Sequence, residues 1–206
     1  MDRDITSFPP SPWRLTAHAY VGVFLVPRAQ LPAPHSSETK PITIFGRGIV
    51  AAAWFKYEDP SPLTYNEIMS TLLVRKGWRP LVSITNIWVD SVASRDGGRA
   101  LWGIPKELAE FEVEPHTSYE AAGRDTEIGS LQVLTSRLLP FEVPLSFSCG
   151  QDRAGQLLIT KVFGKGTFGL FKGSWSFAAN GPLGYLNGRR PKLSLVARPL
   201  RITFGT

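Results

Sequence analysis

Cysteine, histidine and charge are all scarce in this 206-residue chain, and each scarcity excludes a class of protein. The one cysteine, Cys149, cannot support a disulfide scaffold. The three histidines, His18, His35 and His116, lack the spacing of metal ligands, so we expect no metal site. Charged residues make up 19 % of the chain and hydrophobic residues 43 %, which excludes an intrinsically disordered protein.

Long apolar runs are missing as well. The longest candidates, Tyr20–Val26 and Ile49–Phe55, are far shorter than the roughly 20 apolar residues of a membrane-spanning helix. The sequence opens with acids at Asp2 and Asp4 and soon reaches Pro9, unlike a signal peptide. We therefore expect a protein of the reducing cytoplasm without a membrane partner.

Cofactor motifs and nucleic-acid-binding motifs are also absent. No Gly-x-Gly-x-x-Gly, Walker or nucleophile-elbow pattern occurs, so we expect no cofactor. The net charge is +6, from 23 Lys and Arg against 17 Asp and Glu. Basic residues between Arg189 and Arg201 alternate with apolar ones, which is typical of strands with a solvated face. We expect no nucleic-acid partner, because a basic stripe along one helix is missing, and small anionic substrates suit a modest positive charge.

Turn-forming and strand-forming residues, by contrast, are plentiful. The 19 glycines and 17 prolines predict many turns. Between the turns, about ten runs rich in Val, Ile, Phe, Trp and Thr favour strands. These runs are Tyr20–Val26, Ile42–Tyr57, Tyr65–Val74, Leu81–Val89, Leu108–Val113, Leu131–Leu139, Phe141–Ser148, Gln156–Phe163, Phe168–Phe177 and Leu193–Phe204. The pattern predicts a β-barrel or sandwich, in one domain over residues 1–206 with loop-like segments at 1–11 and 28–41.

Two segments call for a closer interpretation. Ile49–Phe55 is apolar on both faces, which fits a strand between a lumen and a covering layer, or a buried helix. One short helix is predicted over Gly98–Trp102, with Asp96 as its cap. Pro105 can then open a second helical turn over Lys106–Ala109.

Three motifs in this chain resemble those of the acetoacetate decarboxylase family. The segment Gly98–Ala109 reads GRALWGIPKELA. It is similar to the family signature, in which Gly-Arg-Glu leads to Pro-Lys-Lys-Leu and the first lysine forms a Schiff base with a keto substrate. Tyr65–Glu67 resembles the family's Tyr-x-Glu strand, whose glutamate points into the pocket, and Pro12–Leu15 resembles its N-terminal start.

This resemblance implies a fold, a site and an assembly. The fold would be a large, mostly antiparallel β-barrel with few short helices, assembled at least as a dimer. Lys106 would be the Schiff-base lysine and Glu67 the acid or base that moves protons. The candidate substrate-binding residues are Tyr65, Trp102, His18 and Arg99. Of these, Trp102 suits core or pocket wall, and Arg99 suits either the helix surface or an anchor for a substrate carboxylate.

Schiff-base chemistry itself sets a requirement on the lysine, whatever the family. Decarboxylating a β-keto acid leaves a carbanion, and an iminium formed by a lysine is an electron sink for it. Only a neutral amine attacks a carbonyl, so the lysine pKa must fall well below its ordinary value of about 10.4. Burial among apolar residues lowers it. Leu101, Trp102, Ile104 and Leu108 supply such surface, so we expect Lys106 to be dry and uncharged.

Two departures from the family pattern leave the reaction open. Glu107 replaces the second lysine of Pro-Lys-Lys, and would hold a proton on Lys106 if it faced the same side. His18 stands where the family's decarboxylases carry an arginine. These departures weaken decarboxylation against an aldol-type or dehydration reaction on a keto acid. A third possibility is a barrel that binds an apolar or polyketide-like molecule without covalent chemistry, as a binding module or cyclase.

Overall fold

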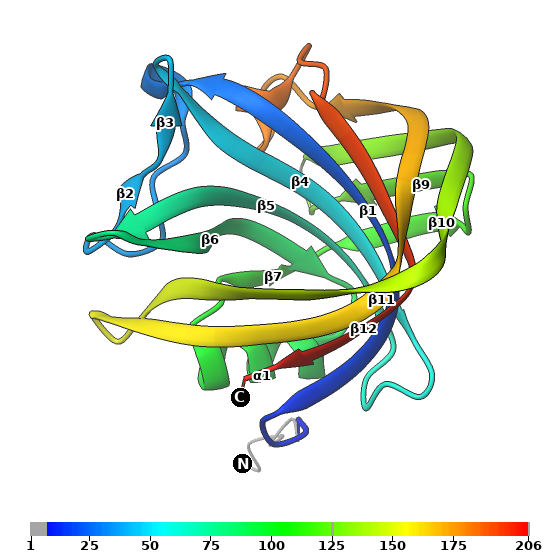
Figure 1. The fold of residues 1–206 in the computed structure, drawn as a ribbon, viewed down its shortest axis with the longest axis horizontal. Coiled ribbons are helices and arrows are strands. Elements are labelled where there is room, and N and C mark those ends of the chain that lie inside the picture. Colours follow the sequence, from blue (N-terminus) through cyan, green and yellow to red (C-terminus); the bar gives the residue numbers. More distant parts are fainter. Residues whose placement is uncertain (1–7, 125, 206) are drawn as a thin grey trace.

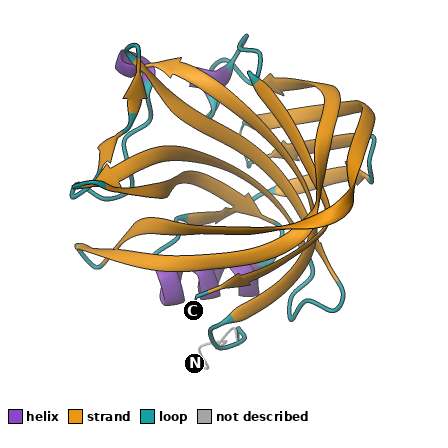
Figure 2. Ribbon diagram, in the orientation of Figure 1, coloured by secondary structure: helices purple, strands orange, loops and turns teal. Residues whose placement is uncertain are grey.

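One sheet of twelve strands forms most of the protein in the computed structural model, which describes residues 8–124 and 126–205 (Figures 1 and 2). The strands are β1 (Trp13–Pro27), β2 (Lys40–Pro41), β3 (Thr43–Ile44), β4 (Arg47–Glu58), β5 (Tyr65–Lys76), β6 (Arg79–Val89), β7 (Lys106–Leu108), β8 (Glu110–Glu114), β9 (Ser118–Ala122), β10 (Glu127–Arg153), β11 (Gln156–Phe177) and β12 (Leu193–Phe204). The α-helix α1 covers Val92–Trp102, and two 3-10 turns, η1 and η2, cover Arg28–Gln30 and Gly184–Leu186.

The sheet curls until it meets itself. Its strand order is β7-β6-β5-β4-β1-β12-β11-β10-β9-β8, and β10 also pairs with β6 through Cys149 and Val82. The strands from β6 round to β10 therefore form a closed ring, as Figure 1 shows. The β6–β10 and β6–β7 pairings are parallel and the others are antiparallel. The predicted mainly-β, mostly antiparallel architecture is confirmed.

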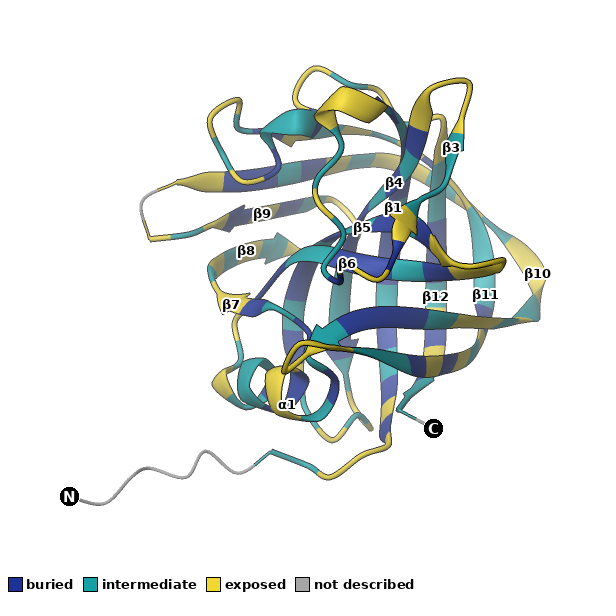
Figure 3. Ribbon diagram, turned by 90° about the vertical axis from the view of Figure 1, so that its left-hand side faces the viewer, coloured by how far each residue is buried: buried dark blue, intermediate teal, exposed yellow. Residues whose placement is uncertain are grey.

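The ring has two cores because its strands are buried on both faces. On β1, Leu15, Ala17 and Ala19 point into the ring, while Tyr20 and Phe24 point to a second core outside it. That outer core is covered by β8, by β9, by the half of β10 that contains Ile128 and by the half of β11 that contains Phe177. Figure 3 shows how buried residues run along the ring strands. The run at 49–55 lies in β4 between the two cores, so its interpretation as a doubly covered strand is confirmed.

β10 and β11 are each continuous where the sequence predicts two strands. The register of their pairing shifts between Leu138 and Glu142, and β11 shifts against β12 between Gly166 and Phe168. Such bulges bend a strand without ending it. Each long strand can therefore belong both to the ring and to the outer layer, which a local reading of turn residues does not foresee.

Helix α1 is longer than predicted and has a different cap. It begins after Ser91, whose hydroxyl accepts a hydrogen bond from the Ser94 amide at 3.2 Å, so the expected Asp96 cap is wrong. Two glycines and an aspartate favour a turn here, but packing overrides that preference, since a Cβ on Gly97 would lie 2.6 Å from Trp13. The predicted helical turn at 106–109 is also wrong, because Lys106 begins β7 and pairs with Ile87.

The loop predictions hold in part. Residues 8–10 lie outside regular structure, and residues 1–7 of the predicted 1–11 loop lie outside the described residues. Segment 28–41 contains η1 and the short strand β2 and is otherwise irregular. Within the described part of the chain, no helix has the length and apolar character that crossing a membrane requires.

Candidate functional site

Lys106 is buried at the end of the ring that α1 covers, with 4 % of its surface exposed. Its Nζ donates to Glu67 Oε2 at 2.7 Å, to Ser94 Oγ at 2.9 Å and to the Tyr65 hydroxyl at 3.3 Å. These partners come from β5 and α1, while the lysine itself is on β7. All three donor positions of the ammonium are therefore used, which a buried charge requires.

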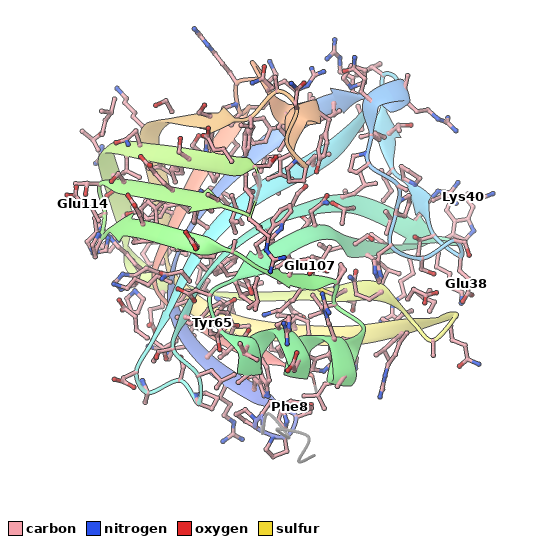
Figure 4. The ribbon with its side chains drawn as sticks, turned by 180° about the vertical axis from the view of Figure 1, so that it is seen from behind. Phe8, Glu38, Lys40, Tyr65, Glu107 and Glu114 are labelled. Atoms are coloured by element: carbon pink, nitrogen blue, oxygen red, sulfur yellow. The ribbon has the colours of Figure 1, made fainter. Side chains whose placement is uncertain are left out.

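Strand alternation turns Lys106 inward and its neighbour outward. Lys106 and Glu107 are consecutive residues of a strand, so their side chains point to opposite faces. Glu107, labelled in Figure 4, is exposed. Its carboxylate pairs with the Arg99 guanidinium on α1. The Arg99 Nε also donates to the Lys106 carbonyl at 2.6 Å. Arg99 thus fixes β7 against α1, and Glu107 does not face the buried amine.

Gly98 makes room for the lysine side chain. A Cβ added at Gly98 would lie 2.9 Å from Lys106 Cδ and 3.0 Å from its Cε. The methylene chain therefore crosses the helix at Gly98, a position that has no side chain. Ser94 lies one turn earlier on the same helix face and holds the end of that chain.

The carboxylate of Glu67 is held from two sides. Its Oε2 accepts from Lys106, and its Oε1 accepts from the Tyr57 hydroxyl at 3.1 Å. The rings of Tyr57 and Tyr65 lie 4.4 Å apart between centroids, on paired positions of β4 and β5. Glu67, Lys106 and the two phenols form one buried network with each charge hydrogen-bonded.

Charge, rather than burial, decides the protonation of the lysine. Burial lowers the pKa of Lys106, but the charge of Glu67 and the hydrogen bonds to Glu67 and Tyr65 outweigh it, so the pKa is raised above its ordinary value. The amine is buried, as expected, but its pKa is shifted upward, which is opposite to the lowered pKa that the sequence predicts. Burial also raises the pKa of Tyr65 to about 12 and, with the charge of Glu67, holds that of Tyr57 well above its usual range.

These shifts predict a loss of stability in alkali. The raised Lys106 pKa contributes stability that is complete below the unfolded value of 10.5 and is lost as pH rises through the folded-state pKa. Tyr65 acts in the same direction above pH 10, where the unfolded chain ionises first. Each such group lowers the free energy of unfolding by about 1.4 kcal/mol per pH unit within its window. Urea unfolding between pH 8 and 12 should show this fall.

Tyr65→Phe provides the control for that prediction. The variant lacks one titrating group, so its free energy of unfolding should fall less steeply between pH 10 and 12 than that of the original protein. Identical slopes for the two proteins would contradict the raised pKa of Tyr65.

A cavity of about 290 Å³ lies within the ring, beside this network. Its wall comes from all seven ring strands and is almost entirely apolar. The polar side chains among its described lining residues are Tyr57, Thr71 and Cys149, and burial raises the pKa of the Cys149 thiol to about 12. Tyr57 belongs both to the wall and to the Glu67 network, whereas Lys106 and Glu67 are not among the described lining residues.

The structure brings together three of the six predicted site residues: Lys106, Glu67 and Tyr65. Trp102 is core, with its ring 4.9 Å from Trp13 and 4.8 Å from Phe204. Arg99 reaches the Lys106 carbonyl from outside and does not line the cavity.

His18 is not brought to this site. The β1 residues that line the cavity are odd-numbered, namely Leu15, Ala19 and Val21, so His18 points to the other face. There it lies 3.6 Å from Glu58, and its ring centroid lies 5.0 Å from that of His116.

Two members of the network, Ser94 and Tyr57, were not predicted. Ser94 precedes Gly98 by four residues, a spacing that would have placed both on one face had the helix been predicted to begin at 92. Tyr57 ends the predicted strand Ile42–Tyr57, but its proximity to Tyr65 depends on the pairing register of β4 and β5. A local pattern does not carry that register.

A family model described as acetoacetate decarboxylase (ADC) matches residues 39–163. No curated protein matches the chain. Acetoacetate decarboxylase from Legionella pneumophila subsp. pneumophila str. Philadelphia 1 has 17 % identity and a TM-score of 0.68, with 100 % of this chain and 89 % of that chain covered. A second structure, from studies of acetoacetate decarboxylase, has 14 % identity and a TM-score of 0.69, covering 100 % and 92 %.

A differently named enzyme shares the fold. The enduracididine biosynthesis enzyme MppR, complexed with the condensation product of pyruvate and imidazole 4-carboxaldehyde, has 15 % identity and a TM-score of 0.60. The alignment covers 98 % of this chain and 90 % of that chain. At these identities the structural likeness shows the fold alone.

Proposed function

The chain belongs to the acetoacetate decarboxylase family, and from this we propose that it is an enzyme in which Lys106 forms a Schiff base with a small carbonyl compound. The observation that carries the proposal is the buried Lys106–Glu67 pair, 2.7 Å apart, linked through Tyr57 to an apolar cavity. A lysine with a proton acceptor in contact, beside an apolar cavity, has what imine formation needs.

Glu67 is the group that accepts the lysine proton. Transfer of one proton from Nζ to Oε2 turns two buried charges into two neutral groups, which a dry site tolerates. The amine lone pair then attacks the carbonyl carbon, and the oxygen leaves as water after taking up protons. Overall, one ammonium and one carbonyl give one iminium and one water, and Glu67 ends as the carboxylate it was at the start. Its negative charge then faces the iminium.

The iminium can accept the electrons released when a neighbouring bond breaks. The residues that line the cavity bear on which reaction follows, decarboxylation or an aldol-type reaction. Decarboxylation requires a bound carboxylate, yet the described lining residues of the cavity include no cation. This favours addition or dehydration of the aldol type, which the condensation product held by the similarly folded MppR also exemplifies. Glu107 has no part in that choice, since it faces away from Lys106.

A non-covalent binder is the second candidate function. The observation that favours it is that neither Lys106 nor Glu67 is among the described lining residues of the cavity, which their network reaches through Tyr57. In that case Lys106 and Glu67 would be a structural ion pair, and the cavity would bind an apolar or polyketide-like molecule.

Reductive trapping tests the proposal directly. The protein is incubated with borohydride and a panel of carbonyl compounds that includes acetoacetate, pyruvate, ketones and aldehydes. Hydride addition to the imine carbon fixes the adduct as a secondary amine, so we expect the added mass on the peptide containing Lys106. Carbon dioxide release then separates decarboxylation from aldol-type reactions. An adduct spread over surface lysines would contradict the proposal.

Gly98→Ala should slow the trapping reaction while the fold persists. The new methyl group must displace the Lys106 chain, and misplacing a reactive group by about 1 Å can reduce a rate by about 100-fold. We expect a 10- to 100-fold slower adduct, as estimated from that principle, with a circular-dichroism spectrum like that of the original protein. Ala100→Ser, on the exposed side of α1, is the control and should react at the original rate.

Two expectations accompany this proposal. We propose that the chain works in the cytoplasm and assembles at least as a dimer, as the family resemblance implies. Light scattering of the purified protein measures the assembly, and a monomeric mass at micromolar concentration would contradict it.

A further inference from the structure

The charges around the reactive lysine cancel, and no described cation is left over. Lys106 and Glu67 form a pair of zero net charge. Arg99 is committed to the Lys106 carbonyl and to Glu107, and His18 lies on the outer face of β1. The described cavity wall contributes no lysine, arginine or histidine. A carboxylate placed in this cavity would therefore have no described cation to pair with.

Building on the proposed Schiff base, we propose that the substrate is an uncharged ketone or aldehyde with an apolar chain, rather than a free keto acid. An ionised carboxylate loses its hydration on entering the ring and finds no opposite charge in return, which is strongly unfavourable. A neutral carbonyl group loses much less hydration free energy than an ion does, so an almost entirely apolar wall tolerates it. The apolar wall therefore favours uncharged substrates over charged ones.

The size of the cavity limits the length of the chain. A liquid water molecule occupies about 30 Å³, so a cavity of about 290 Å³ holds about ten non-hydrogen atoms. The cavity runs along β4 from Tyr57 past Phe55 and Ala53 to Ala51, which all point inward. Two of these residues are small, and they leave the room that an alkyl or aryl chain would fill. Ala53 therefore determines how long a chain is accepted.

Trapping rates for matched pairs of compounds test this inference. A series of 2-pentanone, 2-heptanone and 2-nonanone is compared with 2-oxopentanoate, 2-oxoheptanoate and 2-oxononanoate under borohydride. Each buried methylene should raise the rate at low concentration about fourfold, up to 2-nonanone. The keto acid of each pair should react at least about 100-fold more slowly. Keto acids that react as fast as their ketones would overturn the inference and leave the Schiff base intact.

Calorimetry covers the case in which no Schiff base forms. If no compound gives an adduct, the Schiff-base proposal fails, and calorimetry with 2-nonanone and 2-oxononanoate still measures what the cavity accepts. Tighter binding of 2-nonanone supports the substrate class, whereas equal or absent binding of both overturns it.

Variants of the cavity wall identify the site. Ala53→Leu fills space inside the ring, so the preferred ketone should shorten from 2-nonanone to 2-heptanone or 2-pentanone. Ala100→Leu adds the same bulk on the exposed side of α1, outside the cavity wall, and should leave the preferred length unchanged. An unchanged length preference in Ala53→Leu would place the chain elsewhere and overturn the inference.

Discussion

Replacing Lys106 with methionine is expected to abolish the trapped adduct and to lower the free energy of unfolding by about 3–5 kcal/mol. The adduct disappears because its amine is gone. Stability falls because the carboxyl group of Glu67, buried on β5, loses the ammonium group that compensates it. Mass spectrometry and urea unfolding at pH 7 measure the two effects separately.

The double variant Lys106→Met with Glu67→Gln separates the two roles of the pair. It should recover most of the lost stability, because no charge remains buried, while the adduct stays absent. Lys165→Met is the matched surface control, since the Lys165 side chain is 57 % exposed. That variant should change the free energy of unfolding by less than about 0.5 kcal/mol and react as before. A persistent adduct in Lys106→Met would identify another lysine as the reactive one.

Glu67→Gln alone is expected to move the pH dependence of the reaction. In the original protein the raised pKa keeps Lys106 protonated, so adduct formation should rise with pH above 10.5. Without the Glu67 charge, burial is the largest remaining influence and lowers the lysine pKa. The midpoint should therefore shift to lower pH, while catalytic turnover falls by about 100- to 10,000-fold because the proton acceptor is lost.

Tyr57→Phe distinguishes charge from hydrogen bonding in that result. It removes the bond to Glu67 Oε1 and leaves the carboxylate in place, so the midpoint should stay in the alkaline range. Adduct formation measured from pH 6 to pH 12 compares the variants. A Glu67→Gln midpoint equal to that of the original protein would mean that Glu67 does not set the lysine pKa.

The sequence by itself determined the features that depend on neighbouring residues. The β-forming runs and frequent turns predicted a mainly-β fold, because consecutive residues of a strand alternate between its two faces and a short stretch of sequence shows this pattern. The same alternation put Tyr65 and Glu67 on one face, and the resemblance of the Pro-Lys motif to a family signature predicted Lys106 as the reactive lysine. The structure shows these three side chains in contact.

Only the tertiary structure decided the direction of the Lys106 pKa shift and which residues surround this lysine. Lys106 meets Glu67 and Tyr65 through contacts between residues 39 and 41 positions apart, and these contacts reverse the expected direction of its pKa shift. Side-chain alternation along β1 points His18 away from the ring, and alternation along β7 points Glu107 outward. Electrostatic interaction depends on distance through space, and the partners of a buried charge are fixed by strand register, which local sequence does not encode.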